Sequence, residues 1–192
     1  REENETIKQG ETPEGWKEQP HKLSQKDLDA RWTMKNDANY YGYKNHVRAD
    51  VGSRMITDYV VTDASVHEPQ VLSQLIGEDN RGETLFADSA YKSATVDEWL
   101  GQLGVDNLIH EKGARNRPLS ELQQKINRLK SQIRCTIEHI FGCVDNSMGG
   151  PELEYIGIPR IRTGIGLSNL AYNMLRYVGL LNLGLVPVAQ CA

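Results

Sequence analysis

The sequence lacks the short motifs that mark several large enzyme classes. It contains no Walker-type phosphate loop, no G-x-G-x-x-G, no G-x-S-x-G and no H-E-x-x-H. Each of these motifs places a glycine-rich backbone, a nucleophile or a pair of zinc ligands where a particular chemistry needs it. Their absence argues against nucleotide hydrolases, dinucleotide enzymes, serine hydrolases and zinc peptidases.

Cysteine is scarce, and the few cysteines are poorly spaced for a shared role. Cys135, Cys143 and Cys191 are odd in number and form no C-x-x-C pair. This pattern favours reduced thiols of a cytoplasmic protein over a disulfide framework or a zinc site.

Long hydrophobic runs are missing as well. The chain begins with charged residues (REENE) instead of an apolar leader, and polar residues interrupt its most apolar stretch, 165–188. A membrane span tolerates polar groups at that density only at high cost. We therefore expect no signal peptide and no membrane span, and a cytoplasmic location.

The composition suits a globular protein, and its charge is unevenly distributed. With 192 residues, 39% of them hydrophobic and 25% charged, the chain is long enough for one domain with a sizeable core. The net charge of −4 hides a basic stretch between Glu111 and Arg134, where seven cations face two anions. Such a stretch can bind a polyanion. It is equally typical of a solvated helix face.

Breaker residues and hydrophobic periodicity predict the organisation of the chain. We expect a polar, partly disordered lead-in over 1–37, one domain over 38–183 and a C-terminal tail over 184–192. Strands are expected at 39–50, 55–62, 83–88 and 105–109, and helices at 63–76, 94–103, from 120 to the glycines at 142 and 149–150, and at 165–183. This order of elements predicts an α/β fold, a mixed sheet with helices packed on it.

The long helix has the clearest pattern in the sequence. Ser120 and Gln123 match a capping box at its start. Apolar residues then recur at helical spacing, namely Leu122, Ile126, Leu129, Ile133, Ile137 and Ile140. A polar line runs beside them, namely Asn127, Ser131, Arg134 and Glu138. The pattern predicts a buried stripe with Glu138 at its border, facing the edge of a sheet.

Two acidic residues are the candidates for chemistry. Asp88 ends a predicted strand and opens a turn, and Glu138 lies on the long helix. Two such carboxylates, brought together by folding, can hold a divalent metal ion as in enzymes that cut phosphodiester bonds. Each also has an ordinary alternative. Asp88 can cap the turn, and Glu138 can form a surface ion pair with Arg134, four residues before it.

An aromatic cluster occupies the first predicted strand. Tyr40, Tyr41 and Tyr43 lie close to Lys44 and His46. Aromatic rings beside cations can stack on nucleic-acid bases. A β-hairpin with alternating core and surface aromatics also accounts for the pattern, so both interpretations stay open at this point.

Six segments, taken together and in order, resemble a known family. They are QKDLDARWTMK at 25–35, YGYKNH at 41–46, VTDASVH at 61–67, LFADSAY at 85–91, IRCTIEHIFG at 133–142 and IGLSNLAYN at 165–173. The set is similar to the catalytic domain of bacterial insertion-sequence transposases of the DDE type, and the similarity covers nearly the whole chain.

The resemblance implies an RNase H-like fold in which Asp, Asp and Glu bind two divalent ions. Asp88 matches the second Asp of the family, Glu138 its Glu, and Arg134 its helix arginine. The first Asp of the family lies on a strand upstream of the part that residues 1–10 resemble. We therefore expect the first strand and its Asp to be missing from this chain.

Two departures from the family pattern affect the contacts expected along the long helix. The basic residue that the family has about seven positions after its Glu falls at Asp145 here. The tyrosine that it has three positions before the arginine is replaced by Ser131.

The resemblance implies a DNA transposase that cleaves and transfers strands at insertion-sequence ends with Mg²⁺, or Mn²⁺ as a substitute. Its partners would be transposon and target DNA, and the complete enzyme would act as a homo-oligomer. The residues expected to contact DNA are Arg134, Lys112, Arg115, Arg117 and Lys44. Two alternatives remain: an inactive remnant that binds DNA or a full-length partner, and a stand-alone RNase H-like nuclease.

Overall fold

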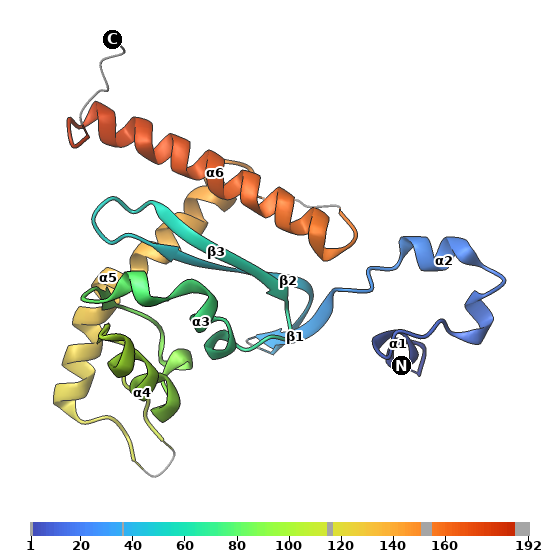
Figure 1. Cartoon of the computed structure of the whole chain (residues 1–192), viewed down its shortest axis with the longest axis horizontal. Helices are drawn as coiled ribbons and strands as arrows, with labels where there is room; N and C mark the ends of the chain where they lie inside the picture. The colour runs from blue at the N-terminus through green and yellow to red at the C-terminus, as the bar shows by residue number, and fades with distance from the viewer. Residues whose placement is uncertain (1, 36, 115–116, 151–154, 187–192) are drawn as a thin grey trace.

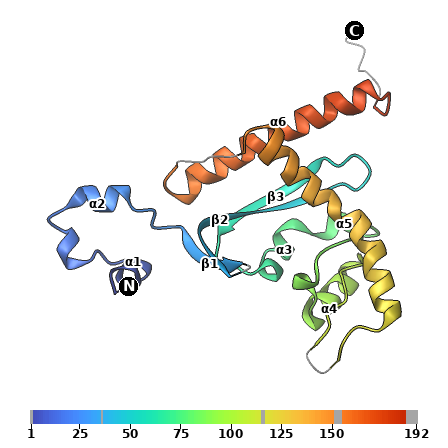
Figure 2. The ribbon, with the colours of Figure 1, turned by 180° about the vertical axis from the view of Figure 1, so that it is seen from behind.

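The computed structural model describes residues 2–35, 37–114, 117–150 and 155–186. These residues form an α/β fold with a three-stranded antiparallel sheet, in the order β1-β2-β3, and a two-stranded parallel sheet of β4 and β5. Figures 1 and 2 show the long helix α6 lying across the antiparallel sheet and α5 running past the ends of the strands. The predicted α/β class is confirmed.

The predicted hairpin is present. β2 (Ala38–Ala49) pairs antiparallel with β3 (Ile56–Asp63), with Tyr43 opposite Asp63. The Asp50 carboxylate accepts a hydrogen bond from the N–H of Ser53 and stabilises the connecting turn. Asp50 therefore acts as the turn residue that its position in the sequence suggests.

A third strand of this sheet was not predicted. β1 (Arg31–Lys35) pairs with the first half of β2, and Trp32 lies opposite Tyr41. β1 has only five residues and lies among charged residues, so its sequence gives no clear strand pattern. Its pairing with β2 identifies it as a strand. The sheet thus begins at Arg31, within the range 1–37 that was predicted to be a lead-in. The domain boundary between residues 37 and 38 remains a prediction. Three short elements precede β1, namely α1 (Glu2–Lys8), η1 (Glu14–Trp16) and α2 (Pro20–Gln25).

The helix predicted after the hairpin is much shorter than its pattern suggests. Only η2 (Glu68–Gln70) and α3 (Leu72–Leu75) form, followed by η3 (Glu78–Asn80). The apolar residues of the pattern are nevertheless buried, and Leu72 and Leu75 face a core shared with α4. The burial pattern was predicted correctly, although the helix itself was not.

The α4 helix (Ala94–Leu103) agrees with its prediction at both ends. The Ser93 hydroxyl accepts a hydrogen bond from the N–H of Val96 at its start. Gly104 ends the helix with a φ of 73°, a left-handed conformation that glycine adopts without a steric penalty.

The two parallel strands are short, but their hydrogen bonds extend further. β4 (Thr84–Leu85) pairs with β5 (Asp106–Asn107). Backbone N–H groups of Asp106, Leu108 and His110 donate in turn to carbonyl oxygens of Glu83, Leu85 and Ala87. This ladder continues to the residue before Asp88, so Asp88 stands at the end of an extended segment, as predicted.

The α5 helix (Glu121–Ser147) begins with the predicted capping box of Ser120 and Gln123. Its apolar stripe is only half buried. Ile140 is 1% exposed, whereas Leu122 and Leu129 are 67% and 63% exposed. The prediction of one continuous buried stripe is wrong, because none of the described elements covers the apolar face in the first half of the helix.

The α6 helix (Ile158–Asn182) begins earlier than predicted. The carboxylates of Asp27 and Asp29 accept hydrogen bonds from the N–H groups of Gly157 and Ile158. They satisfy N–H groups that a helix start leaves unpaired, so residues far away in the sequence stabilise the early start. None of the helices in the described ranges is long and apolar enough to span a membrane.

The buried hydrophobic residues form separate clusters instead of one core. One joins α3 and α4 with Val105 and Ile109, another joins Ile56 with Ile140 and Tyr172, and a third joins Val61 with α6. The first cluster belongs to the parallel strands, and the other two belong to the antiparallel hairpin. The division between them determines where the candidate site lies.

Candidate active site

The polar line of α5 attaches this helix to the end of the parallel strands. The side chain of Asn127 both accepts from the N–H and donates to the carbonyl of Glu111. The Lys130 ammonium, which is buried, donates to the carbonyl of Ile109 at 2.9 Å. These contacts hold α5 against the residues that follow β5. Lys130 therefore contributes to packing and is not one of the exposed cations of the basic stretch.

Asp88 caps the turn, as one of its two predicted roles requires, and it also faces α5. Its carboxylate caps η4 (Ser89–Tyr91), because Oδ1 accepts from the Ala90 N–H at 3.3 Å and the Ser89 hydroxyl at 3.1 Å. Its other oxygen, Oδ2, lies 3.8 Å from Nη1 of Arg134. The turn cap therefore orients the carboxylate toward α5 and is compatible with a function there.

Arg134 brings the two predicted acidic residues together. Its Nη2 lies 2.6 Å from Oε1 of Glu138, one turn further along α5, while its Nη1 faces Asp88. Both carboxylates are more than half exposed, and the guanidinium between them is mostly covered. Carboxylates that approach each other repel, and a shared cation relieves that repulsion.

The surroundings of Asp88 favour its charged form. Partial burial acts to raise the pKa of Asp88. Hydrogen bonds from Ala90 and Ser89, with the positive charges of Arg134 and His110, outweigh burial and hold this pKa below its ordinary value. Asp88 is therefore a carboxylate at neutral pH, as a metal ligand must be.

His110 is a neighbour of the site that the sequence did not reveal. Its backbone N–H donates to Ala87, and its Nε2 lies 3.4 Å from the Ser131 hydroxyl. Burial and the charge of Arg134 lower the pKa of His110. One signal was available: His110 follows β5 as Asp88 follows β4, and the carboxyl ends of parallel strands meet at one edge.

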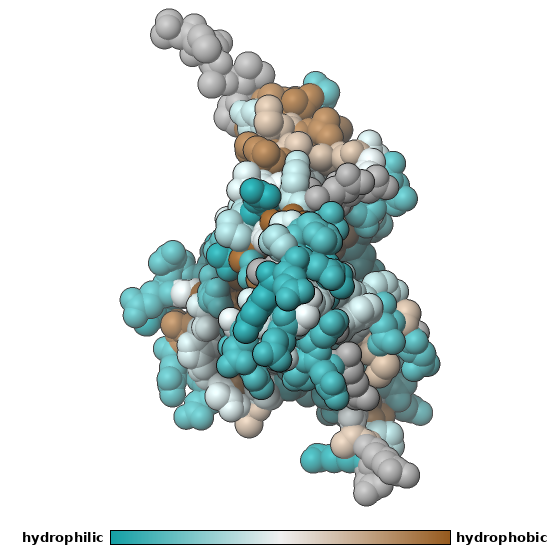
Figure 3. All heavy atoms as spheres, turned by 90° about the vertical axis from the view of Figure 1, so that its right-hand side faces the viewer, coloured by the Kyte–Doolittle hydropathy of each residue, from teal (hydrophilic) through white to brown (hydrophobic). Residues whose placement is uncertain are grey.

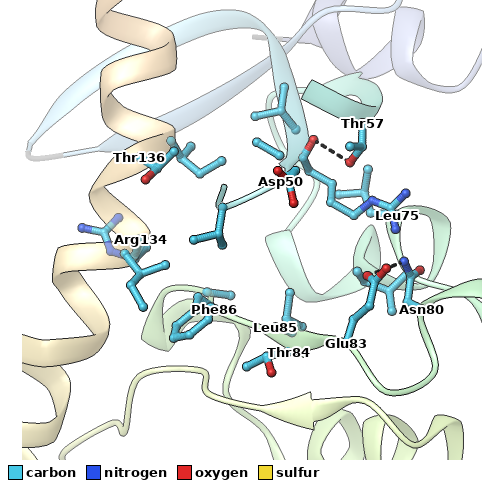
Figure 4. A pocket seen from close by; sticks show the side chains of 18 of the residues that line it. Asp50, Thr57, Leu75, Asn80, Glu83, Thr84, Leu85, Phe86, Arg134 and Thr136 are labelled. Carbon is cyan, nitrogen blue, oxygen red and sulfur yellow. Dashed lines mark hydrogen bonds between the residues drawn. The ribbon is translucent and has the colours of Figure 1, made fainter. Parts of the chain in front are cut away.

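A cavity of about 580 Å³ adjoins the pair. It lies between the second half of β2, the β4 segment and α5, and Figure 4 shows Phe86, Arg134 and Thr136 on one side of it and Leu75 and Asn80 on the other. Most of its lining is apolar, including Val47, Leu85 and Ile137.

Two arginines that line the cavity have a buried N–H without a partner among the described residues. They are the Nε groups of Arg48 and Arg134. A buried donor that is left unpaired costs free energy, so native structures normally supply an acceptor. Both donors lack such an acceptor among the described residues.

The strands that border the cavity have open edges. β2 pairs with β3 from Tyr43 to Ala49, but β1 covers its other edge only from Ala38 to Gly42. β4 has β5 as its only strand partner within the described ranges. Two unpaired edges thus face each other across a largely apolar gap.

The cations predicted to contact DNA differ in their surroundings. Lys44 donates to the carbonyl of Val66 and pairs with Glu68 at 3.1 Å. Lys112 and Arg117 are exposed on the loop before α5. Arg115 lies outside the described residues. The loop and the first half of α5 therefore present positive charge to solvent beside the acidic pair, and Lys44 is already engaged.

The described residues contain no group of three potential metal ligands. Asp63, like Asp50, stabilises the local backbone, because its carboxylate accepts from the N–H of Ser65. Neither Asp50 nor Asp63 is part of the site formed by Asp88 and Glu138. Within the described residues the site has two carboxylates, and a largely apolar cavity adjoins it.

These observations define the class of protein: an α/β domain whose strand-end aspartate and helix glutamate share one arginine beside a basic surface. The family described as "Transposase DDE domain" matches residues 12–174, and the chain belongs to this family. Its members typically use a divalent metal ion and act on DNA.

A curated relative agrees with this assignment. The transposase for insertion sequence element IS1106 of Neisseria meningitidis serogroup B is 34% identical over 152 residues. The alignment covers 79% of this chain but 52% of that relative, so the chain spans about half of the relative's length. No solved structure matches the chain.

Proposed function

We propose that this chain is part of the catalytic domain of an insertion-sequence transposase that cleaves DNA at the ends of the element and transfers the strands. The observation that carries the proposal is the meeting of Asp88 and Glu138 at Arg134, beside the cavity. The family and the relative support a transposase, and the geometry supports these residues as its acidic pair.

Asp88 and Glu138 are the residues that would hold a divalent ion, Mg²⁺ or Mn²⁺. Both present exposed carboxylate oxygens, and Mg²⁺ is commonly bound by one or two carboxylates together with substrate phosphate and water. When bound, such an ion activates the attacking oxygen and stabilises the leaving oxygen of a phosphodiester. The exposed oxygens of these two carboxylates therefore fit the metal.

We further propose an RNase H-like sheet, completed by a strand in the cavity that carries the third carboxylate. The open edges of β2 and β4 would pair with this strand, and the apolar lining would pack on its side chains. A carboxylate on it would accept from the orphan N–H of Arg134. One added strand would join the separate hydrophobic clusters into one core.

Arg134 has a second role in this proposal. Its guanidinium holds the two carboxylates in place and presents its remaining face to a phosphate of the DNA backbone. Lys112 and Arg117, exposed on the loop before α5, would supply salt-dependent attraction to the backbone. Arg115, which lies outside the described residues, and Lys44, once released from Glu68, would add to it.

The complete transposase acts as a homo-oligomer in this proposal. Support comes from the outer face of α6, which exposes a stripe of apolar side chains, namely Leu167, Leu170, Met174, Leu175 and Val178. Figure 3 shows hydrophobic residues gathered at the top of the molecule, over α6. A contiguous exposed apolar patch often marks a protein–protein contact.

The test is a strand-cleavage assay on DNA with the ends of the element, using Mg²⁺ or Mn²⁺. We expect the 192-residue chain alone to be inactive, because the described residues supply two carboxylates and not three. Extending it upstream by the strand that fills the cavity should restore cleavage. Asp88→Asn and Glu138→Gln should then each abolish it without unfolding the protein.

The other outcomes separate the alternatives. Cleavage by the 192-residue chain that Asp88→Ala abolishes would show that another ligand completes the site. Cleavage of generic DNA or RNA–DNA hybrids with no preference for element ends would favour a stand-alone nuclease. Binding to DNA or to an intact transposase, with no cleavage in the extended chain, would favour an inactive remnant.

A further inference from the structure

Arg134 faces a carboxylate oxygen that a divalent ion would need. Its Nη2 lies 2.6 Å from Oε1 of Glu138, and its Nη1 lies 3.8 Å from Oδ2 of Asp88. The other oxygen of Asp88, Oδ1, accepts hydrogen bonds from Ser89 and Ala90. An ion that bridges the two acidic residues would therefore contact Oδ2 of Asp88, the oxygen that the guanidinium faces.

The arginine side chain is more deeply buried than the two carboxylates. The side chain of Arg134 is 26% exposed, whereas those of Asp88 and Glu138 are 52% and 61% exposed. The Nε of Arg134 is buried, and its two Nη groups reach the carboxylates. Because the arginine stem has several rotatable bonds, the Nη groups can turn to another anion while α5 stays in place. The carboxylates are open to an incoming ion without any unfolding.

The neighbouring basic side chains are bound elsewhere or uncharged. The ammonium of Lys130 is buried and donates to the carbonyl of Ile109. Burial, with the positive charge of Arg134, lowers the pKa of His110, so its ring is mostly neutral at pH 7. Among the described residues, the ion pairs of both carboxylates are with Arg134. The guanidinium is therefore the cation that relieves their mutual repulsion.

The charges at the site favour exchange over joint binding. Two carboxylates and one guanidinium together carry one net negative charge. A divalent ion on the same carboxylates would lie close to the guanidinium, and like charges at such a distance repel. The ion alone neutralises both carboxylates. The guanidinium then loses its anionic partners and is free for a new one.

We propose that Arg134 is a placeholder cation: its guanidinium competes with a divalent ion for Asp88 and Glu138, and binding of the ion releases it to a DNA phosphate. The proposal rests on the proposed function and adds an order of events, because Arg134 contacts the carboxylates and the phosphate in turn. The planar fork of a guanidinium matches a phosphate as well as a carboxylate. The ion and the DNA therefore bind cooperatively.

The first test is equilibrium binding of Mn²⁺ to the 192-residue chain at pH 7, with the free ion measured by electron paramagnetic resonance. Arg134→Gln removes the competing charge and should tighten binding about 5-fold or more, as expected for coupled sites. Arg134→Lys keeps the charge and should stay close to the parent. Arg128→Gln is the matched control, because Arg128 is an exposed cation on another face of α5, and it should change binding by less than about twofold.

The second test is binding of a fluorescein-labelled DNA duplex in EDTA, where no ion can release the arginine. Glu138→Gln removes the partner of the guanidinium and should tighten binding about 5-fold. The same change in an Arg134→Gln background should have an effect of less than about twofold. Glu121→Gln, which removes an exposed carboxylate of the same helix, measures the gain that net charge alone produces.

Thermal unfolding of each variant checks that the fold is intact. If Arg134→Gln does not fold, Arg134→Met replaces it with the same expected results, because methionine keeps most of the apolar stem. Both tests then read the loss of the charge and not the loss of packing.

The outcomes separate the placeholder from the proposed function. If Arg134→Gln weakens Mn²⁺ binding, the arginine holds the ligands for the ion, and the placeholder is overturned while the acidic pair stands as a metal site. If Glu138→Gln tightens DNA binding equally with and without Arg134, the release step is overturned. If Mn²⁺ binding is the same in the parent and in Glu138→Gln, the proposed metal site itself fails.

Discussion

The two edges of β2 differ in how completely the chain satisfies them. On one edge, β3 pairs along the strand and α6 covers the resulting hairpin (Figure 1). The Asn173 side chain bonds both the N–H and the carbonyl of Ile56, and the Tyr172 hydroxyl donates to Arg54. On the other edge, the strand faces a cavity with two orphan arginine N–H groups.

The difference separates stability from function in this chain. The closed side contains the hydrogen bonds that attach α6 to the hairpin and the buried parts of α5 and α6, so it holds the hairpin and these helices together. The open side contains the acidic pair and has unpaired edges, which natural proteins normally cover or pair. A segment that fills the open side would therefore build the site and complete the core at the same time.

The largest expected effect contrasts the two halves of α5. Ile140→Ala should lower the free energy of unfolding by about 2–5 kcal/mol, because it removes a fully buried side chain. Leu129→Ala should change it by less than about 0.5 kcal/mol, because Leu129 is exposed. Urea unfolding of both variants measures the contrast. Equal losses would show that the first half of α5 is packed in solution.

The next effect concerns the closed edge. Asn173→Ala should cost about 1–3 kcal/mol, because it leaves the N–H and carbonyl of Ile56 without their side-chain partner. Asn182, exposed at the end of α6, is the control and should tolerate alanine. The measurement is the midpoint of chemical unfolding. A neutral Asn173→Ala would mean that solvent already reaches this turn.

A smaller effect tests the open edge. Arg48→Met removes an unpaired buried N–H while keeping most of the side-chain length, so it should change the stability of this chain by at most about 1 kcal/mol, in the stabilising direction. In a chain extended by the proposed strand, the same substitution should destabilise, because the N–H would then have an acceptor. Thermal unfolding of this chain and of the extended chain, each with and without Arg48→Met, measures the effect. A stability change of the same sign in both chains would argue against an acceptor in the cavity.

The smallest effect is the pH dependence of Asp88. Its folded pKa lies below the ordinary value of 3.8, so its charge stabilises the fold above that value, and this contribution is lost as the pH falls through the folded pKa. Asp88→Asn should therefore lose less stability than the parent when the pH falls from about 5 to about 3, by under about 1 kcal/mol for an exposed group. Unfolding at several pH values measures it, and parallel curves would contradict the assigned pKa shift.

The elements predicted well from the sequence are those with local signals. The hairpin, the α4 helix with its Ser93 and Gly104 ends, and the Ser120 capping box all depend on residues within a few positions of one another. The elements predicted poorly depend on distant partners. β1 needs β2 to be a strand, and the start of α6 needs Asp27 and Asp29.

The candidate site shows the same limit. The resemblance pointed to Asp88, Arg134 and Glu138, and the polar line of α5 correctly indicated the face that meets the sheet. His110 was missed because a lone histidine after a short strand has no pattern of its own. The half-exposed stripe of α5 was mispredicted because periodicity shows that a face is apolar but not whether anything covers it.

The amino-acid sequence alone determined the local elements and the family, and it predicted the acidic pair, because caps, turns and motifs act over short distances along the chain. Only the tertiary structure decided that both carboxylates contact one guanidinium, that His110 stands beside them and that a cavity separates the sheets. Those relations join residues far apart in sequence, and packing and the satisfaction of buried polar groups across the whole fold determine them.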